Sequence, residues 1–428
     1  MNLIKLLFEF IFKLLAHIYI FLSELIISIL IFTREGKHSF KNIKIFKVGN
    51  IDFEKKTVTL GGYDHQYIVC GSPSANERET LIMMGGIPTD SSESMIWMAE
   101  ELSKKNASLK ILILHLPFYE NHSEITPTKN GVLFNSITLP FLREISNKEE
   151  KIDPKFSHFN QAKIVALMLK KLNIKKAHFI GHDRGVVVFE HLMIENERLF
   201  LSFSRGAQLW DYYEYEWLKL APYICVGPPH RFFTYPWQIK LLFNIITFFG
   251  FPLAIRSEGF LKKCRNLKKG TQLYDRYTHL TYKANFTAKK FLQKFRQTML
   301  QTDSITEIKN RKYLPEQVKI MQYQGEDEFK LSSKNRLISD QPYFGKYNLF
   351  RNEIYDLYPD CVSQDLSRCQ NQYLETKEDY KKVKLIPNAR MSFFALIPDS
   401  AHFNVIENPK GCASAVSDFI HECNLKNI

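Results

Sequence analysis

The stretch Ala177–Met193 reads AHFIGHDRGVVVFEHLM, and the rest of the chain can be interpreted outward from it. Its first four residues form a compact apolar run that predicts a strand, and the run from Val186 predicts a helix. Between them, Gly181 and Gly185 permit a tight turn that pushes the central residue, Asp183, into the open. Asp183 is therefore a candidate nucleophile, and the structural alternative is a helix N-cap.

Apolar runs on both sides of this stretch continue an alternation of strands and helices. The predicted strands are Thr57–Leu60, Gln66–Cys70, Leu81–Met84, Ile111–Leu114, Val318–Gln322 and Phe393–Ile397. The predicted helices before the opening stretch are Ser91–Lys104 and Asn160–Leu172. Alternation of this kind predicts an α/β fold with a mostly parallel central sheet covered by helices.

The domain organisation follows from the places where this alternation stops. After residue 205 the chain becomes rich in aromatic residues and helix formers, which predicts an inserted helical lid. A later interruption is polar and has no clear period. The predicted parts are an N-terminal segment at 1–34, a first core part at 50–205, the lid at 206–312, and a second core part at 313–428 that contains an insert at 332–384.

Composition excludes several classes of function. The 428 residues are 45% hydrophobic and carry a formal net charge of +13, but the basic residues are scattered in short pairs, so nucleic-acid binding is not expected. The seven cysteines are widely spaced without a C-x-x-C motif, so neither a zinc knuckle nor a disulfide scaffold is indicated.

The N-terminal segment at 1–34 is predicted to be a membrane anchor. Leu14–Phe32 is long enough, at about 1.5 Å per residue, to cross a hydrocarbon core of about 30 Å, although Glu24 is costly there. A single span is favoured over an in-plane or hairpin anchor and over a cleaved signal peptide. Basic residues cluster after the apolar run, which places the large domain on the cytosolic side of the endoplasmic reticulum or a similar membrane.

A second motif ends the strand that lies about 100 residues upstream of Asp183. It reads Met84-Gly85-Gly86-Ile87-Pro88. Together with G-H-D-R-G at 181–185, it resembles the α/β-hydrolase superfamily, in the branch that contains epoxide hydrolases and dehalogenases. Gly85 replaces the histidine of the family's H-G-x-P motif. LHLPFYE at 114–120 is similar to the family's D-L-P-G-Y-G, with the Asp and both Gly replaced.

The resemblance also selects an acid and a base. Gly325-Glu326-Asp327-Glu328 follows a predicted strand and resembles the family's G-x-x-acid turn, which selects Glu328, with Asp327 as the alternative. IPDSAHFNVIENP at 397–409 is similar to the family's histidine loop and selects His402. The chain order of nucleophile, acid and histidine is that of this fold.

The resemblance implies a mechanism with a covalent intermediate. Asp183 would attack a saturated carbon and form an alkyl ester, and His402 would activate the water that hydrolyses it. Glu328 would orient His402. The backbone N–H groups of Ile87 and Arg184 would form the oxyanion hole. No metal or organic cofactor is expected.

The leaving group is less well defined by the sequence. Arg184 stands where haloalkane dehalogenases often have Trp, and Val187 stands where fluoroacetate-type dehalogenases have a second Arg. The lid has Phe at 248, 249 and 295, near the positions where epoxide hydrolases have Tyr. Epoxide hydrolysis of a small lipophilic substrate is favoured. The alternatives are a dehalogenase-like or other Asp-nucleophile hydrolase, and an inactive binding or structural protein of the same fold.

Overall fold

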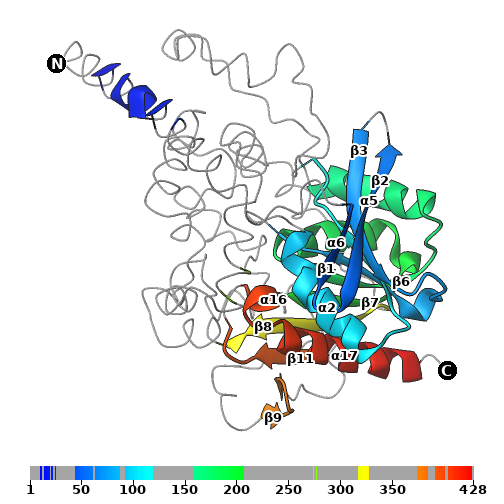
Figure 1. Ribbon diagram of the computed structural model, residues 1–428. Coiled ribbons are helices and arrows are strands. Elements are labelled where there is room, and N and C mark those ends of the chain that lie inside the picture. The colour runs from blue at the N-terminus through cyan, green and yellow to red at the C-terminus, as the bar shows by residue number, and fades with distance from the viewer. Residues whose placement is uncertain are drawn as a thin grey trace.

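The structure is a computed structural model of the chain. It describes residues 44–60, 63–86, 92–118, 158–206, 317–326, 374–383, 391–400 and 403–426, with scattered positions between 10 and 25 and at 273 and 276. These residues build one continuous sheet with helices packed against it (Figure 1). Most of the predicted lid and of the predicted insert falls outside the described residues.

The sheet is mixed, with a parallel centre. In the described part of the chain it has eleven strands in the order β1-β2-β3-β5-β4-β6-β7-β8-β11-β10-β9. The strands from β5 to β11 in that order pair parallel, and the two ends of the sheet pair antiparallel. Their bounds are β1 Ile45–Val48, β2 Ile51–Leu60, β3 Tyr63–Gly71, β4 Thr80–Met84, β5 Lys110–Leu114, β6 Ala177–His182, β7 Phe200–Gly206, β8 Lys319–Gly325, β9 Leu374–Thr376, β10 Lys381–Val383 and β11 Met391–Ile397.

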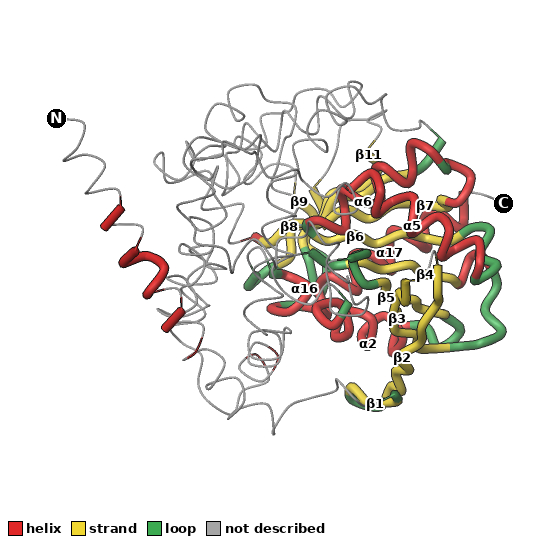
Figure 2. The backbone as a smooth tube through the Cα atoms, turned by 90° about the horizontal axis from the view of Figure 1, so that it is seen from above, coloured by secondary structure: helices red, strands yellow, loops and turns green. Residues whose placement is uncertain are grey.

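Helices cover both faces of this sheet. They are α2 Ile96–Lys105, α5 His158–Lys171, α6 Arg184–Glu195, α16 Asn404–Glu407 and α17 Pro409–Lys426, with short 3₁₀ turns at Glu77–Glu79, Glu93–Met95 and Glu197–Leu199. Figure 2 shows the strands side by side with helices around them. Helix α5 packs on α6, and α2 packs on α17.

Aromatic contacts and strand register assign the two helix pairs to opposite faces. Phe189 of α6 contacts the ring of Phe203 in β7, and Phe419 of α17 contacts the ring of Phe393 in β11. The registers pair Phe203 with Ile320 and Phe393 with Met321. Since consecutive residues of a strand point to opposite faces, α6 and α17 cover opposite sides.

The predicted α/β architecture is confirmed, and three features were missed, the first of which is the edge strand β1 at Ile45–Val48. No strand was predicted at Phe200–Gly206, yet β7 lies at the centre of the sheet beside β6. The insert at 332–384 was given no secondary structure, yet its end forms β9 and β10, which extend the sheet past β11.

The membrane prediction concerns residues of which few are described. Residues 14–19 are helical, and the rest of the predicted span is described only at 21, 22 and 25. Among the residues that the structure describes, no helix combines the length and apolarity needed to cross a bilayer.

A histidine in the central sheet makes stability depend on pH. His178 of β6 is buried, and its Nδ1 lies 2.7 Å from Oγ of Ser202. Burial lowers the pKa of His178 to about 4, although hydrogen bonds with Asn424 and with the Arg78 backbone oppose the shift. Between about pH 6.5 and this value the unfolded chain binds more protons than the folded one, so stability falls as the pH is lowered.

We therefore expect the free energy of unfolding to decrease by about 3 kcal/mol through His178 alone as the pH falls across that window. The His178→Asn variant removes the titrating group and should lose less stability between pH 7 and pH 4.5 than the unmodified protein. Urea unfolding at both pH values measures the difference. Equal losses in the two proteins would contradict the assignment.

Candidate active site

The turn that carries Asp183 is formed as the sequence predicts. Asp183 lies between the last residue of β6 and the first residue of α6, with φ 50° and ψ −121°. Its N–H donates to the carbonyl of Gly206 at 3.0 Å, and its own carbonyl accepts from the N–H of Val186 at 3.0 Å. A positive φ is strained for a residue with a side chain, and such strain is concentrated at functional sites.

Asp183 is more exposed than its neighbours in the turn. Of residues 181–185, all of them described, Asp183 is the one that is not buried. Its carboxylate makes no capping hydrogen bond to α6, so the structure gives no support to the N-cap alternative. The turn therefore presents a carboxylate at the carboxyl edge of the sheet, where parallel α/β sheets place their ligand sites.

The two glycine motifs meet at this turn. A Cβ added at Gly185 would overlap the carbonyl oxygen of Met84, and a Cβ added at Gly86 would overlap the carboxylate of Asp183. Both contacts follow from the pairing of β4 with β6, which sets Met84 opposite Gly181. The backbone of the G-G-I-P turn thus lies against the candidate nucleophile as far as Gly86. Ile87 lies outside the described residues.

The predicted acid and base also lie outside the described residues, but the segments that lead to them are described. Strands β8 and β11 are parallel neighbours, and Gly325 pairs with Ile397 at their carboxyl ends. The turn toward Glu328 and Asp327 and the loop toward His402 therefore leave the sheet side by side. After the loop, the ring of Phe403 lies 6.2 Å from the ring of His182, beside Asp183.

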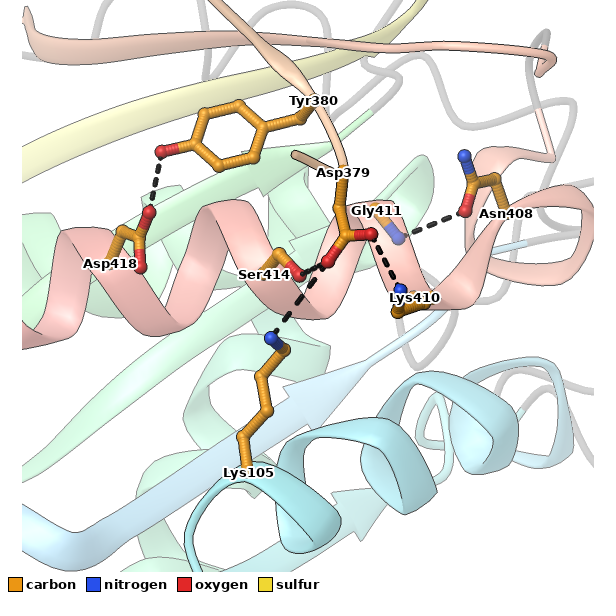
Figure 3. A network of polar contacts seen from close by, with 8 residues as sticks. All are labelled: Lys105, Asp379, Tyr380, Asn408, Lys410, Gly411, Ser414 and Asp418. Atoms are coloured by element: carbon orange, nitrogen blue, oxygen red, sulfur yellow. Dashed lines mark hydrogen bonds and ion pairs between the residues drawn. The ribbon is translucent and has the colours of Figure 1, made fainter. Parts of the chain in front are cut away.

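Side chains of the histidine loop hold its two ends together. Oγ of Ser400 donates to the carbonyl of Ile397 at 2.8 Å, and Nδ2 of Asn408 donates to the carbonyl of Pro398 at 2.9 Å. Oδ1 of Asn408 in turn accepts from the N–H of Gly411 in α17 at 2.9 Å (Figure 3). The loop is therefore closed at its base on the first turn of α17.

The end of the insert is fixed to the same helix. Asp379, between β9 and β10, pairs with Lys410 at 2.8 Å and accepts a hydrogen bond from Ser414 at 2.6 Å (Figure 3). Burial raises the pKa of Asp379, but the bonds to Lys410 and Ser414 outweigh it and leave the pKa below its usual value. Glu326, just before the predicted acid, forms an ion pair of 2.7 Å with Lys381 of β10. No motif in the sequence predicts these contacts.

The side of the strand-to-helix turn that faces α5 carries a buried positive charge. Arg184 is buried there, and burial together with the charges of Arg184 and His191 lowers the pKa of His158 well below its usual value. Val187 is also fully buried. The second arginine that would bind a substrate carboxylate is therefore replaced by an aliphatic core residue.

Two described residues of the predicted lid beyond β7 contact the core, namely Leu273 and Arg276. Nη1 of Arg276 donates to the carbonyl of Ile406 at 3.1 Å, and its guanidinium lies 5.8 Å from the ring centre of Trp97 in α2. Burial lowers the pKa of Arg276, while Glu100 and Glu101 act in the opposite direction. The lid segment thus reaches the helix that directly follows the histidine loop.

Comparisons with known proteins agree with this architecture. No protein-family model matches the chain, and no curated protein matches it in sequence. Among solved structures, the juvenile hormone epoxide hydrolase of the silkworm Bombyx mori aligns with a TM-score of 0.52 at 13% identity, covering 89% of this chain and 78% of that one. A laboratory-evolved variant of potato epoxide hydrolase aligns with a TM-score of 0.51 at 13% identity, covering 86% of this chain and 99% of that one.

The fold and the strand-to-helix turn define the class. Similarity at this level of identity shows the fold, and the order and pairing of the central strands agree with it. The chain has the α/β-hydrolase fold, in the form found in epoxide hydrolases.

Proposed function

We propose that the protein is a hydrolase that forms a covalent ester on Asp183, and that its substrate is a small lipophilic epoxide. The observation that carries the proposal is the geometry of Asp183. A carboxylate stands on a strained strand-to-helix turn, partly exposed among buried neighbours, with the backbone of Gly86 against it. Holding a reactive group rigidly in this way is what nucleophilic catalysis requires.

The first half-reaction opens the ring. A carboxylate oxygen of Asp183 forms a bond to an epoxide carbon while the carbon–oxygen bond of the ring breaks. The ring oxygen departs as an alkoxide and takes a proton from a donor in the lid or from water. The product of this step is a hydroxyalkyl ester of Asp183.

The second half-reaction restores the enzyme. His402 takes a proton from water, whose oxygen attacks the ester carbonyl of Asp183, and Glu328 or Asp327 stabilises the imidazolium. The N–H groups of Ile87 and Arg184 bind the resulting oxyanion. When the intermediate collapses, the diol oxygen leaves with the proton from His402. The carboxyl group of Asp183 then releases the remaining proton of the water molecule, which balances the proton taken up in ring opening and regenerates the carboxylate.

The character of the described residues favours an uncharged substrate. Val187 is fully buried and Arg184 is buried against α5, which argues against the binding of a substrate carboxylate through these two positions. The names of the two similar structures, both epoxide hydrolases, support an epoxide over a halide. A haloalkane would be cleaved by the same attack with halide as the leaving group, and it is the second candidate.

Oxygen-isotope labelling tests the proposal directly. A single turnover in ¹⁸O-water should place the heavy oxygen in the carboxylate of Asp183, because water attacks the ester carbonyl and not the substrate carbon. Mass spectrometry of the peptide that contains Asp183 measures this for a panel of lipophilic epoxides and haloalkanes. Label found only in the product would contradict an ester intermediate. No turnover and no label across the panel would favour a binding protein of the same fold.

We propose further that residues 1–34 anchor the protein in a membrane, with the hydrolase domain on the cytosolic side. The described positions Phe10, Leu14, Ile18, Phe21 and Leu25 are exposed and recur every three or four residues, which is the pattern of an apolar helix face. A lipophilic substrate concentrates in the bilayer, so an anchored enzyme would meet it at a higher local concentration.

We expect the full chain to stay in the membrane fraction after washing with alkaline carbonate, and a variant that lacks residues 1–34 to be released. Immunoblotting of pellet and supernatant measures both. Binding of the truncated chain to liposomes would identify a second contact, for which the apolar lid stretch at 243–255 is the candidate. Release of the full chain by carbonate would contradict a span and favour an in-plane helix.

A further inference from the structure

A tyrosine two strands away reaches the backbone of the nucleophile turn. Tyr323 belongs to β8, and its hydroxyl donates to the carbonyl of Gly181 in β6 at 3.0 Å. Strand β7 lies between these two strands, so the side chain crosses the whole width of a neighbouring strand. Tyr323 is fully buried, and it lies on the face of the sheet that α17 covers, opposite α6.

Gly206 of β7 makes this crossing possible. A Cβ at Gly206 would overlap the ring and the hydroxyl of Tyr323, so the ring occupies the space that any other residue would fill. The register sets Gly206 opposite both Tyr323 and His182. A glycine at the end of β7 is thus required by the tyrosine rather than by a turn.

The same glycine holds the nucleophile. The carbonyl of Gly206 accepts the N–H of Asp183 at 3.0 Å, while the hydroxyl of Tyr323 holds the carbonyl of Gly181, two residues before Asp183. The ring therefore fixes the strand that ends in the turn, and it also packs on the residue that binds the amide of Asp183. Both restraints act on a residue whose φ of 50° persists only when its surroundings enforce it.

The hydroxyl is a permanent donor. Burial raises the pKa of Tyr323 well above its usual value, and the nearby Cys412 raises it further. The phenol thus stays a hydrogen-bond donor to Gly181 beyond the pH at which an ordinary tyrosine ionises.

We propose that Tyr323 is a positioning residue for Asp183, which it acts on through the carbonyl of Gly181 and the backbone of Gly206. This inference rests on the proposed function of Asp183 as the nucleophile. The competing explanation is that Tyr323 contributes only to stability, as a buried tyrosine with a satisfied hydroxyl usually does. The two explanations differ in whether removal of the hydroxyl alters the geometry of Asp183.

The Tyr323→Phe variant tests this, because it removes the hydroxyl and keeps the ring over Gly206. We expect the rate of ester formation on Asp183 to fall about tenfold with KM nearly unchanged, since the loss of one buried hydrogen bond misplaces the nucleophile rather than the substrate. Hydrogen exchange of the Asp183 amide should become faster. Rapid-quench mass spectrometry and exchange of the peptide around Asp183 measure the two effects.

Tyr380→Phe is the matched control. Tyr380 is also buried and its hydroxyl donates to Asp418 at 2.8 Å, but it lies beside β10, two strands beyond β8 and four strands from β6. It should lower stability to a similar extent and leave ester formation and exchange at Asp183 unchanged.

A second variant, Gly206→Ala, should displace the ring of Tyr323 and also slow ester formation. Combined with Tyr323→Phe, it should act less than additively.

The outcomes distinguish a failure of the positioning role of Tyr323 from a failure of the proposed function of Asp183. Ester formation and amide exchange in Tyr323→Phe equal to those of the unmodified protein would overturn the positioning role, as would equal losses in Tyr380→Phe. If the unmodified protein forms no ester with any substrate, the proposed function fails. The exchange of the Asp183 amide in Tyr323→Phe then still decides whether the tyrosine positions the turn.

Discussion

The Asp183→Asn variant is expected to lose activity by about 10⁴-fold or more while it stays folded, because an amide cannot act as the nucleophile that forms the proposed ester. Asparagine has nearly the same shape as aspartate and tolerates positive φ better than most residues, so it suits the φ of 50° at this position. Steady-state turnover of the best substrate, together with thermal unfolding, measures activity and stability in the same preparation.

A control with the same substitution at another residue of positive φ is available at Asp399. This residue also has a positive φ, of 53°, and it lies in the turn directly after β11. The Asp399→Asn variant should keep its activity within a few-fold, as a surface substitution usually does. Activity of Asp183→Asn close to that of Asp399→Asn would contradict the assignment of the nucleophile, whatever the substrate.

The turn at Asp183 could be predicted because the pattern of residues that marks it is local. Glycines at 181 and 185 flank the acid, an apolar run precedes it and another follows it. The structure adds the reason for the second glycine, which is the close approach of the carbonyl of Met84 from the adjacent strand. That contact depends on the pairing of β4 with β6, which the chain alternation implies but does not specify residue by residue.

Strand β7 was missed because its polar residues are buried. Phe200–Gly206 reads FLSFSRG, which has no clear apolar pattern. In the fold, Oγ of Ser202 bonds His178, and Arg205 forms an ion pair of 2.9 Å with Glu190 of α6. These partners come from other elements of the sheet and its helix layer, so the burial of the polar groups becomes visible only when the elements are assembled.

A departure from the family pattern is explained in the same way. Phe118 stands where the D-L-P-G-Y-G motif has its first glycine, and it has the positive φ, 63°, that a glycine would accept without strain. Its ring packs edge-on against Tyr63 and His65 of β3. The aromatic contacts stabilise a backbone conformation that the side chain alone disfavours, and long-range packing of this kind cannot be read from the motif.

Within the candidate site, the contact of Tyr323 with Gly181 is also a long-range contact that the sequence does not predict. It joins residues 142 positions apart, and neither belongs to a motif with the other. Asp183, His402 and Glu328 are candidates on the basis of local motifs and chain order, whereas the contacts that hold the turn at Asp183 follow from sheet topology. Sequence reasoning therefore identifies candidate reactive groups more easily than it identifies the groups that would position them.

The His402→Gln variant is expected to stop the reaction half-way. If His402 activates the water, its loss should leave ester formation intact and slow ester hydrolysis by about 10²–10⁴-fold, the usual contribution of a general base. Rapid mixing should then show the consumption of one equivalent of epoxide per enzyme molecule without release of diol, and the mass of the intact protein should increase by that of one substrate molecule. The ester should be found on Asp183.

This expectation depends on where the histidine loop lies. The loop leaves the sheet at Ile397, beside Gly325 of β8, and returns with Phe403 against His182, which is the neighbour of Asp183. His402 precedes Phe403 directly in the chain, so the ends of the loop that carries it are described although His402 itself is not. The exposed His421 of α17 provides a control, because the His421→Gln variant should turn over substrate as the unmodified protein does.

Full turnover by His402→Gln would assign the base to another residue. Failure of His402→Gln to form any ester, in a folded protein, would instead mean that the histidine acts before or during the attack of Asp183, and the division of the reaction into two half-reactions with separate groups would be wrong.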